Sequence, residues 1–181
     1  MTDTNTAKSL SNIAIALERD GFLRTLLRHL AGTLQDVVGL DEAAGFISVV
    51  GQEMGDQMGE MYRSALAVEH LTRAQVADVL VDLKRRIQGD FYVISQDDEK
   101  IVFGNRACPF GDRVIDRPAL CMMTSNVFGS IASRELGYAK VELQETIARG
   151  APGCRVVLYL KPGPEADHAE GREYHGPMEP E

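Results

Sequence analysis

The spacing of apolar residues changes once along this 181-residue chain, close to Gly89. Before that point, apolar residues recur every three to four positions, as they do on one face of an α-helix. After it, Phe91-Tyr-Val-Ile-Ser95 and Lys100-Ile-Val-Phe103 form two strand-like runs around a polar turn, which is typical of a hairpin. This change predicts helices followed by strands, the element order of an α+β domain.

Four helices are expected before the change. Helical spacing extends over residues 9–34, where Asp20-Gly21 is expected to separate two helices. Asp41 is a good N-cap for a third helix that reaches Leu66, and Thr72 opens a fourth with a capping-box pattern. The region after the hairpin is expected to hold a loop over 105–119, a helix over 120–136 ended by Gly137, and strands over 138–147 and 154–160.

The expected fold is therefore α+β, with N-terminal helices packed on a small antiparallel sheet. Its C-terminal half has the order β-β-loop-α-β-β. We expect a flexible tail over residues 1–8 and a single domain over 9–161. Four prolines and many charges follow Lys161, so residues 162–181 are expected to be a disordered tail.

Charge and hydropathy exclude several classes of function. The chain carries 27 acidic residues against 19 Lys and Arg, a net charge of −8, and a phosphate backbone needs a basic face. No apolar run approaches the ~20 residues of a membrane-spanning helix, and the polar N-terminus lacks a signal-peptide pattern. We expect a cytoplasmic protein that contacts neither nucleic acid nor membrane, with its cysteines reduced.

The three cysteines are the strongest candidates for chemistry. Cys108, Cys121 and Cys154 make a poor disulfide framework, but they suit a metal or iron–sulphur site. Cys121 opens a predicted helix, whose N-terminus is expected to lower the thiol pKa and favour the thiolate that a metal needs. The alternative is that the three thiols only fill the core, because free cysteine is among the most buried residue types.

A fourth ligand is not obvious from the sequence. Glu142 and Glu145 lie on the strand before Cys154 and face opposite sides of it, so at most one of them points at the site. Asp112 and Asp116 lie in the loop that carries Cys108, and any of these carboxylates could complete a zinc site. The alternative is that all four are surface charges.

The third predicted helix carries Gly51, Gly55 and Gly59 on one face, at a cost of about 1 kcal/mol each relative to alanine. Another helix, a ligand or a second subunit must therefore approach that face closely. As an alternative to the metal site, a ligand pocket would lie between these glycines and Phe91 and Val93. We expect a homodimer, and a signalling protein is a further candidate partner.

No catalytic constellation is visible, so we do not expect an enzyme. Ser125 and Ser130 have no evident base partner, and the chain contains no Gly-rich phosphate loop, paired-histidine metal motif or nucleophile elbow.

Most of the chain resembles the methanogen output domain family, which occurs in or beside signalling proteins. The segments that carry the resemblance are Asp20–Arg24, Gly45–Ile47, Asn105-Arg-Ala-Cys-Pro-Phe110, Leu120-Cys-Met-Met123, Gly129, Gly137-Tyr138 and Ile147–Gly150 with Cys154. This resemblance implies a role in signalling output without a known reaction.

The C-terminal half is also similar to the effector part of iron–sulphur repressors, through Cys108, Cys121 and Gly150 followed by Cys154. That similarity implies a 4Fe-4S cluster. The chain lacks the family's further cysteine and its winged-helix pattern, so DNA binding is not implied. A looser similarity to the 4-vinyl reductase domain rests on Cys121, Glu142 and Cys154, and it implies a structural zinc and an apolar ligand pocket.

The residues and the resemblances together predict a sensory or output domain that binds a metal centre through Cys108, Cys121 and Cys154. An iron–sulphur cluster is favoured over zinc. The alternative is a small-molecule-binding regulatory module with a structural zinc or with no metal.

Overall fold

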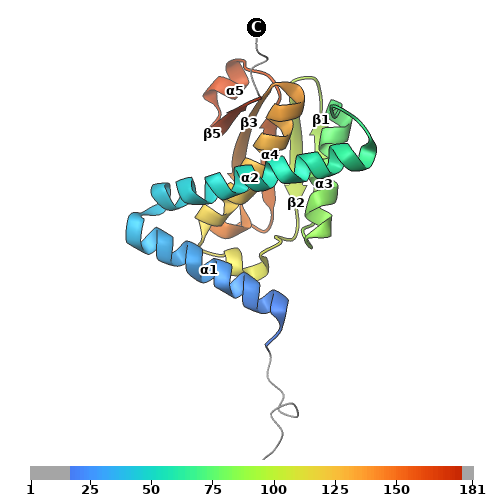
Figure 1. The fold of residues 1–181 in the computed structure, drawn as a ribbon. Helices are drawn as coiled ribbons and strands as arrows, with labels where there is room; N and C mark the ends of the chain where they lie inside the picture. Colours follow the sequence, from blue (N-terminus) through green and yellow to red (C-terminus); the bar gives the residue numbers. More distant parts are fainter. Residues whose placement is uncertain (1–16, 177–181) are drawn as a thin grey trace, which may run out of the picture.

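The computed structural model of the protein describes residues 17–176, which form an α+β fold. The helices are α1 (Arg19–Val38), α2 (Leu40–Leu66), α3 (Arg73–Arg86), α4 (Cys121–Leu136) and α5 (Pro164–His168). The strands are β1 (Phe91–Gln96), β2 (Lys100–Asn105), β3 (Tyr138–Glu145), β4 (Cys154–Tyr159) and β5 (Gly171–His175). The predicted fold class is confirmed, with long helices first and an antiparallel sheet after them (Figure 1).

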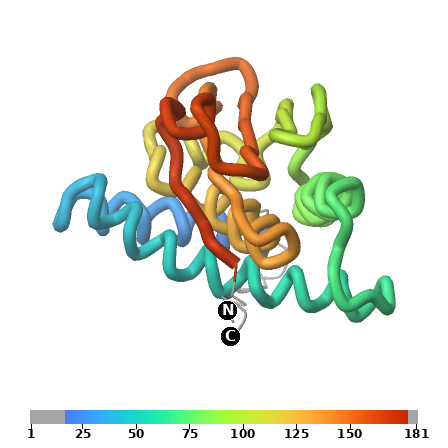
Figure 2. The backbone as a smooth tube through the Cα atoms, turned by 90° about the horizontal axis from the view of Figure 1, so that it is seen from above, coloured from blue at the N-terminus to red at the C-terminus, as the bar shows by residue number. Residues whose placement is uncertain are grey.

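The five strands form one sheet in the order β1-β2-β4-β3-β5, and every neighbouring pair is antiparallel. The predicted hairpin over 91–103 is confirmed as β1 and β2. Helix α4 lies between the sheet and α2, and α3 stands beside it (Figure 2). This arrangement makes α4 the central element, with most of its middle turns buried.

The main core lies between α4 and the sheet. Phe128 of α4 meets Phe103 of β2 and Phe91 of β1 edge to face, with ring centroids 5.3 and 5.4 Å apart. All three rings are buried, and Ile101 and Leu158 extend the same apolar layer along the strands. Burying each such side chain stabilises the fold by about 1.5–3 kcal/mol.

The glycine stripe on α2 is explained by close helix packing. A Cβ atom added at Gly51 would lie 2.8 Å from the Cβ of Asn126, and one added at Gly55 would lie 2.8 Å from the Cβ of Ser130. Both neighbours belong to α4, so the glycines let the two helix backbones approach each other. Gly59 continues the stripe and is also buried.

The helix ends agree with the sequence in part. The capping box of Thr72 and Gln75 is confirmed at the start of α3, and Gly137, with φ +86°, follows the last residue of α4 as predicted. The predicted break at Asp20-Gly21 is wrong, because α1 begins at Arg19 and runs through both residues. The predicted N-cap at Asp41 is also wrong. Gly39 precedes α2, and Asp41 stabilises its first turn as an acidic residue.

The predicted disordered tail over 162–181 is wrong for the residues that form α5 and β5. Strand β5 pairs with β3, and the Tyr174 ring packs against Gly129, where an added Cβ would lie only 2.1 Å from the ring. The Tyr174 hydroxyl also hydrogen-bonds Ser125 at 3.0 Å. The predicted flexible tail over 1–8 lies outside the described residues. Across residues 17–176, no helix combines the length and hydropathy needed to cross a bilayer.

Candidate functional site

Cys108, Cys121 and Cys154 line one small cavity of about 30 Å³, which we call the cysteine cavity. All three thiols are free and partly buried. They come from the loop after β2, the first residue of α4 and the first residue of β4. The remaining wall is mainly apolar and is made by Phe91, Val114, Leu120, Leu143 and Val156, together with Thr124 and Thr146.

Strand register explains how residues so far apart in sequence meet here. Asn105, the last residue of β2, is paired with Cys154, the first residue of β4. Cys108 lies three residues beyond Asn105, and the chain then returns through two 3-10 turns to begin α4 at Cys121. We call residues 106–120 the cysteine loop. The convergence therefore depends on the β2–β4 pairing and on the return path of this loop.

Cys154 has two hydrogen-bond donors around its sulphur. The side-chain amide of Asn105 donates to Sγ at 3.6 Å, and the backbone N–H of Ile147 donates at 3.5 Å. Donors of this kind stabilise negative charge on sulphur, as a metal-bound thiolate requires.

The other two thiols are held in their neutral form by burial. Burial raises the pKa of Cys121 to about 12, and the nearby Cys108 and Cys154 sulphurs raise it further. Burial likewise raises the pKa of Cys108, which the Phe110 backbone N–H partly offsets. The expectation that a helix N-terminus lowers the pKa of Cys121 is therefore wrong, because desolvation outweighs the helix dipole.

Lys84 of α3 adds a buried positive charge beside the thiols. Lys84 is only 3% exposed, and its ammonium donates a hydrogen bond to the Thr124 hydroxyl at 2.8 Å. The ammonium also lies 5.3 Å from the centroids of the Phe91 and Phe128 rings. Burial lowers the pKa of Lys84 to about 8, and the three cysteines act in the opposite direction. Within residues 17–176, Lys84 forms no salt bridge.

Sequence reasoning missed Lys84, although a signal was present. Val76, Leu80 and Lys84 are spaced four apart on α3, which places the lysine on the same face as two fully buried residues. A lysine in an apolar stripe points to a buried cation that needs an anionic or hydroxyl neighbour.

The candidate fourth ligands do not reach the cysteine cavity. Glu142 accepts a hydrogen bond from the Tyr159 hydroxyl at 3.1 Å, on the sheet face opposite to Leu143. Glu145 is exposed, and neither Asp112 nor Asp116 lines the cavity. Among the described residues, no group of three or more His, Cys, Asp or Glu side chains stands ready to hold a metal ion.

The residues of the alternative ligand pocket are dispersed. Gly51 and Gly55 face α4, Phe91 lines the cysteine cavity, and Val93 is exposed on the edge strand β1. The two serines weighed as nucleophiles are engaged elsewhere. Ser125 bonds Tyr174, and Ser130 donates to Asp56 at 2.6 Å.

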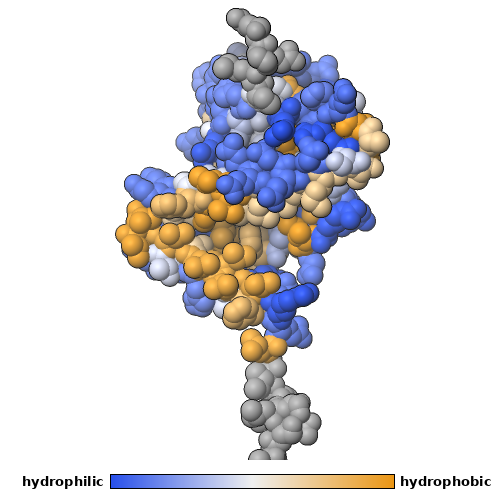
Figure 3. Space-filling view, in the orientation of Figure 1, coloured by the Kyte–Doolittle hydropathy of each residue, from blue (hydrophilic) through white to orange (hydrophobic). Residues whose placement is uncertain are grey.

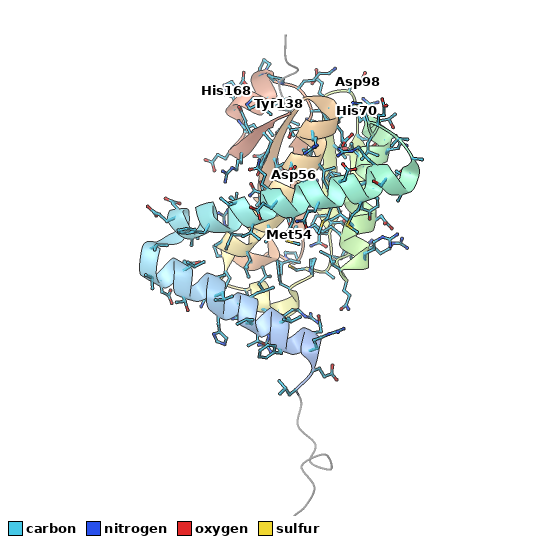
Figure 4. All side chains as sticks on the ribbon, in the orientation of Figure 1. Met54, Asp56, His70, Asp98, Tyr138 and His168 are labelled. Atoms are coloured by element: carbon cyan, nitrogen blue, oxygen red, sulfur yellow. The ribbon has the colours of Figure 1, made fainter. Side chains whose placement is uncertain are left out.

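A second and much larger hollow lies next to the cysteine cavity. It is an apolar groove of about 640 Å³ between α1, α2 and the end of α3, and Met54 of α2 is one of its lining residues (Figure 4). Pro109, Phe110 and Leu120 line both the groove and the cysteine cavity. These three residues of the cysteine loop therefore form a wall that the two hollows share.

Comparison with solved structures shows a fold that other proteins share. The phenol-responsive sensory domain of the transcription activator PoxR, solved with phenol, superposes with a TM-score of 0.60 at 16% identity. That match covers 81% of this chain and 76% of the PoxR chain. A trafficking protein particle complex subunit 3 from Naegleria fowleri, covalently bound to palmitic acid, gives a TM-score of 0.60 at 13% identity. It covers 78% of this chain and 96% of the other.

Sequence comparison gives one family. No curated protein sequence matches the chain. The profile of methanogen output domain 1 matches residues 26–159, a span that holds all three cysteines, Lys84 and the cysteine loop. The chain belongs to the methanogen output domain 1 family.

Proposed function

We propose that this protein is a sensory output domain whose sensing centre is the cysteine cavity, where Cys108, Cys121 and Cys154 hold a thiophilic metal centre. The observation that carries the proposal is the convergence of all three cysteines of the chain on one cavity. Membership of an output-domain family and a fold shared with a phenol-responsive sensory domain support the signalling part.

The donor types suit a soft metal, although the three thiols of the described structure are not yet grouped closely enough to hold one. Three sulphurs line the cavity without a competing carboxylate, and thiolate ligands select zinc, copper(I) or iron–sulphur centres. A cavity of about 30 Å³ has room for about one water molecule, so the three thiols would have to draw together around a single ion. A 4Fe-4S cluster is larger and requires the cysteine loop to move outward. We favour the cluster, which would supply a redox-sensitive centre, and keep zinc as the alternative.

The surroundings of the sulphurs act on thiolate formation in two opposite directions. Burial keeps the pKa values of Cys108 and Cys121 high, so metal binding must release protons from both thiols. The Lys84 ammonium then supplies a buried positive charge next to the thiolates. The donors to Cys154 favour negative charge on sulphur, as Lys84 does, and so oppose the effect of burial.

The test is metal analysis of protein purified without oxygen. We expect iron and sulphide in stoichiometric amounts with a broad absorption band near ~400 nm, or one zinc per chain in colourless protein. Cys108→Ser, Cys121→Ser and Cys154→Ser should each lose the metal. Met122→Leu is the matched control, because Met122 packs in the same apolar cluster as Cys108 and Cys121 but offers no thiol.

Two results would contradict the proposal. One is a wild-type protein that contains no metal, even after reconstitution with iron and sulphide or with zinc. The other is wild-type metal content in all three serine variants. Either result leaves the small-molecule-binding module as the better account of the domain.

A further inference from the structure

Helix α1 is long but has almost no core of its own. It spans 20 residues, and only Ala31 and Gly32 are buried. Helices in proteins gain most of their stability from packing an apolar face, and two small residues bury little area. The remaining apolar side chains of α1 therefore need a surface that the described part of this chain does not supply.

These side chains belong to a continuous exposed surface, which we call the α1–α2 face. It consists of the large exposed apolar residues between Phe22 and Met54, among them Leu26, Leu30, Phe46 and Val49 (Figure 3). Together they expose on the order of 1,000 Å², which is above the few hundred Å² typical of a monomer and matches one side of a standard interface.

The position of this surface is specific. Few large apolar side chains are exposed elsewhere in the described chain. They are Leu17, Met61, Leu66, Ile87 and residues 92–94 on β1. The α1–α2 face borders the apolar groove of about 640 Å³, so it presents both a flat surface and a hollow. A protruding apolar helix is the shape that complements such a surface.

Charge favours a second copy of this chain as the partner. The first half of α1 carries Arg19, Arg24 and Arg28 against one acid, Asp20, which pairs with Arg24. Asp36, Asp41 and Glu42 lie around the corner between α1 and α2. No Lys or Arg occurs from Leu30 to Tyr62. When two copies meet antiparallel about a two-fold axis, the basic end of each α1 faces the acidic corner of the other.

We propose that a second copy of this chain covers the α1–α2 face, with apolar residues of α1 seated in the groove of the partner, to form a two-fold homodimer. A small apolar molecule could fill the groove alone, but it would leave Leu26, Val37 and Val49 exposed, because these residues lie outside the groove lining.

The proposed interface reaches the cysteine loop. Pro109, Phe110 and Leu120 line the groove as well as the cysteine cavity, and the Arg28 guanidinium of α1 donates to the carbonyls of Arg113 and Ile115 at 2.7 Å each. A change in the cavity that moves the loop must therefore change the strength of the dimer, and dimerisation must affect the cavity in return. This coupling rests on the proposed function, whereas the dimer itself does not.

The test is sedimentation equilibrium of the full chain, with and without metal. The wild type should sediment at twice 19.8 kDa. Leu30→Glu should weaken the dimer about 30-fold or more, because it places a charge in the interface. Leu30 is 53% exposed, so the variant should keep its fold, which circular dichroism checks. Ile94→Glu is the matched control, since Ile94 is 46% exposed on β1 and lies away from the face.

A wild type that stays at 19.8 kDa up to ~100 μM would overturn the dimer, whether native mass spectrometry then finds a bound small molecule or an empty groove. A Leu30→Glu variant with wild-type dimer affinity would overturn the assigned surface. Equal dimer affinities with and without metal would overturn the coupling alone. Cysteine variants that lose metal but stay dimeric separate the dimer from the proposed metal site.

Discussion

The Lys84 ammonium and the Thr124 hydroxyl form a hydrogen bond of 2.8 Å inside the domain, near the three thiols and over two phenylalanine rings. A neutral hydroxyl compensates an ammonium only in part, because the ammonium has three donors and carries a full charge. Burial of this group costs free energy of folding, as the lowered pKa of Lys84 also indicates.

Replacing Lys84 should separate stability from metal binding. We expect Lys84→Met to unfold at a higher temperature than the wild type when both are metal-free, by about 1–3 kcal/mol in free energy, because an apolar side chain fills the same space without the charge. The same variant should bind metal about tenfold more weakly, because its thiolates lose their buried cation. Thermal denaturation and competition with a chelator measure the two effects.

The contrary result for this variant is informative. A Lys84→Met protein that is less stable without metal would mean that the lysine has an ordinary structural role. Thr124→Val is the companion variant, because it removes the hydroxyl partner but keeps the ammonium. It should destabilise the metal-free protein by about 1–3 kcal/mol, the cost of leaving a buried donor unpaired.

The glycines of α2 give a prediction with an internal control. Gly55→Ala should destabilise the protein by about 1–3 kcal/mol, because the new Cβ would lie 2.8 Å from Ser130 and 3.2 Å from Val127 of α4. Gly45→Ala in the same helix meets nothing within 4 Å and should stabilise the protein by about 0.5–1 kcal/mol through helix propensity. Urea denaturation of both variants measures the difference, and equal effects would mean that α2 and α4 are not in close contact.

Structural features formed by residues close together in the sequence could be predicted from the sequence. The capping box at Thr72 involves residues three apart, and the β1–β2 hairpin joins neighbouring runs, so both could be read from the chain. Strand β5 could not be predicted in this way, because it depends on pairing with β3 and on the packing of Tyr174 against Gly129. Composition alone makes that segment resemble a disordered tail.

The candidate site, likewise, could be predicted from the sequence only in part. The cysteines were identified from their residue type, but their convergence depends on the β2–β4 register, which sets Cys154 opposite Asn105. The thiol pKa was predicted in the wrong direction, because a helix N-terminus is visible in sequence and burial by distant residues is not. The long return of the cysteine loop, where the backbone N–H of Asp116 donates to the Ala148 carbonyl, has no local signal at all.

The buried carboxylate of Glu135 should be important for stability. It pairs with Arg63 and accepts the backbone N–H of Leu71 at 2.7 Å, and its side chain is fully buried. We expect Glu135→Ala to cost about 3 kcal/mol, because it leaves the mostly buried guanidinium with one partner fewer. Glu60→Ala removes the exposed partner of the same arginine and should cost much less, because solvent screens an exposed ion pair. Similar losses in chemical denaturation would contradict this assignment.

Acid should destabilise the folded protein in part by protonating Asp82. The Tyr62 hydroxyl, at 2.6 Å, and then Arg85 and Arg86 hold the pKa of this carboxyl well below its usual range. A lowered pKa means that the stabilisation is present above about pH 4 and is lost as the pH falls and the folded carboxyl takes up its proton. We therefore expect Asp82→Asn to be less stable than the wild type at pH 7, with a difference that shrinks toward pH 2. A difference that stays constant across this range in melting experiments would contradict the assignment.

Arg28 should control how firmly α1 holds the cysteine loop. Its guanidinium donates to two loop carbonyls, and α1 has little other buried contact with the domain. We expect Arg28→Ala to increase hydrogen exchange in residues 111–117 at least tenfold, because both carbonyls lose a charged donor and the 3-10 turn at Gly111–Val114 can open more often. Mass spectrometry of exchanged peptides measures this, while peptides of β3 and β4 should exchange at wild-type rates.

Arg19→Ala is the control for this exchange experiment, because Arg19 lies on the same helix and is exposed. It should leave exchange in the loop unchanged. If Arg28→Ala also leaves the loop unchanged, the apolar contacts of Ala31 and Leu34 with Val114 and Leu120 are enough to hold it. In that case α1 and the cysteine loop would move as one body, and a signal from the cavity would reach the α1–α2 face through packing alone.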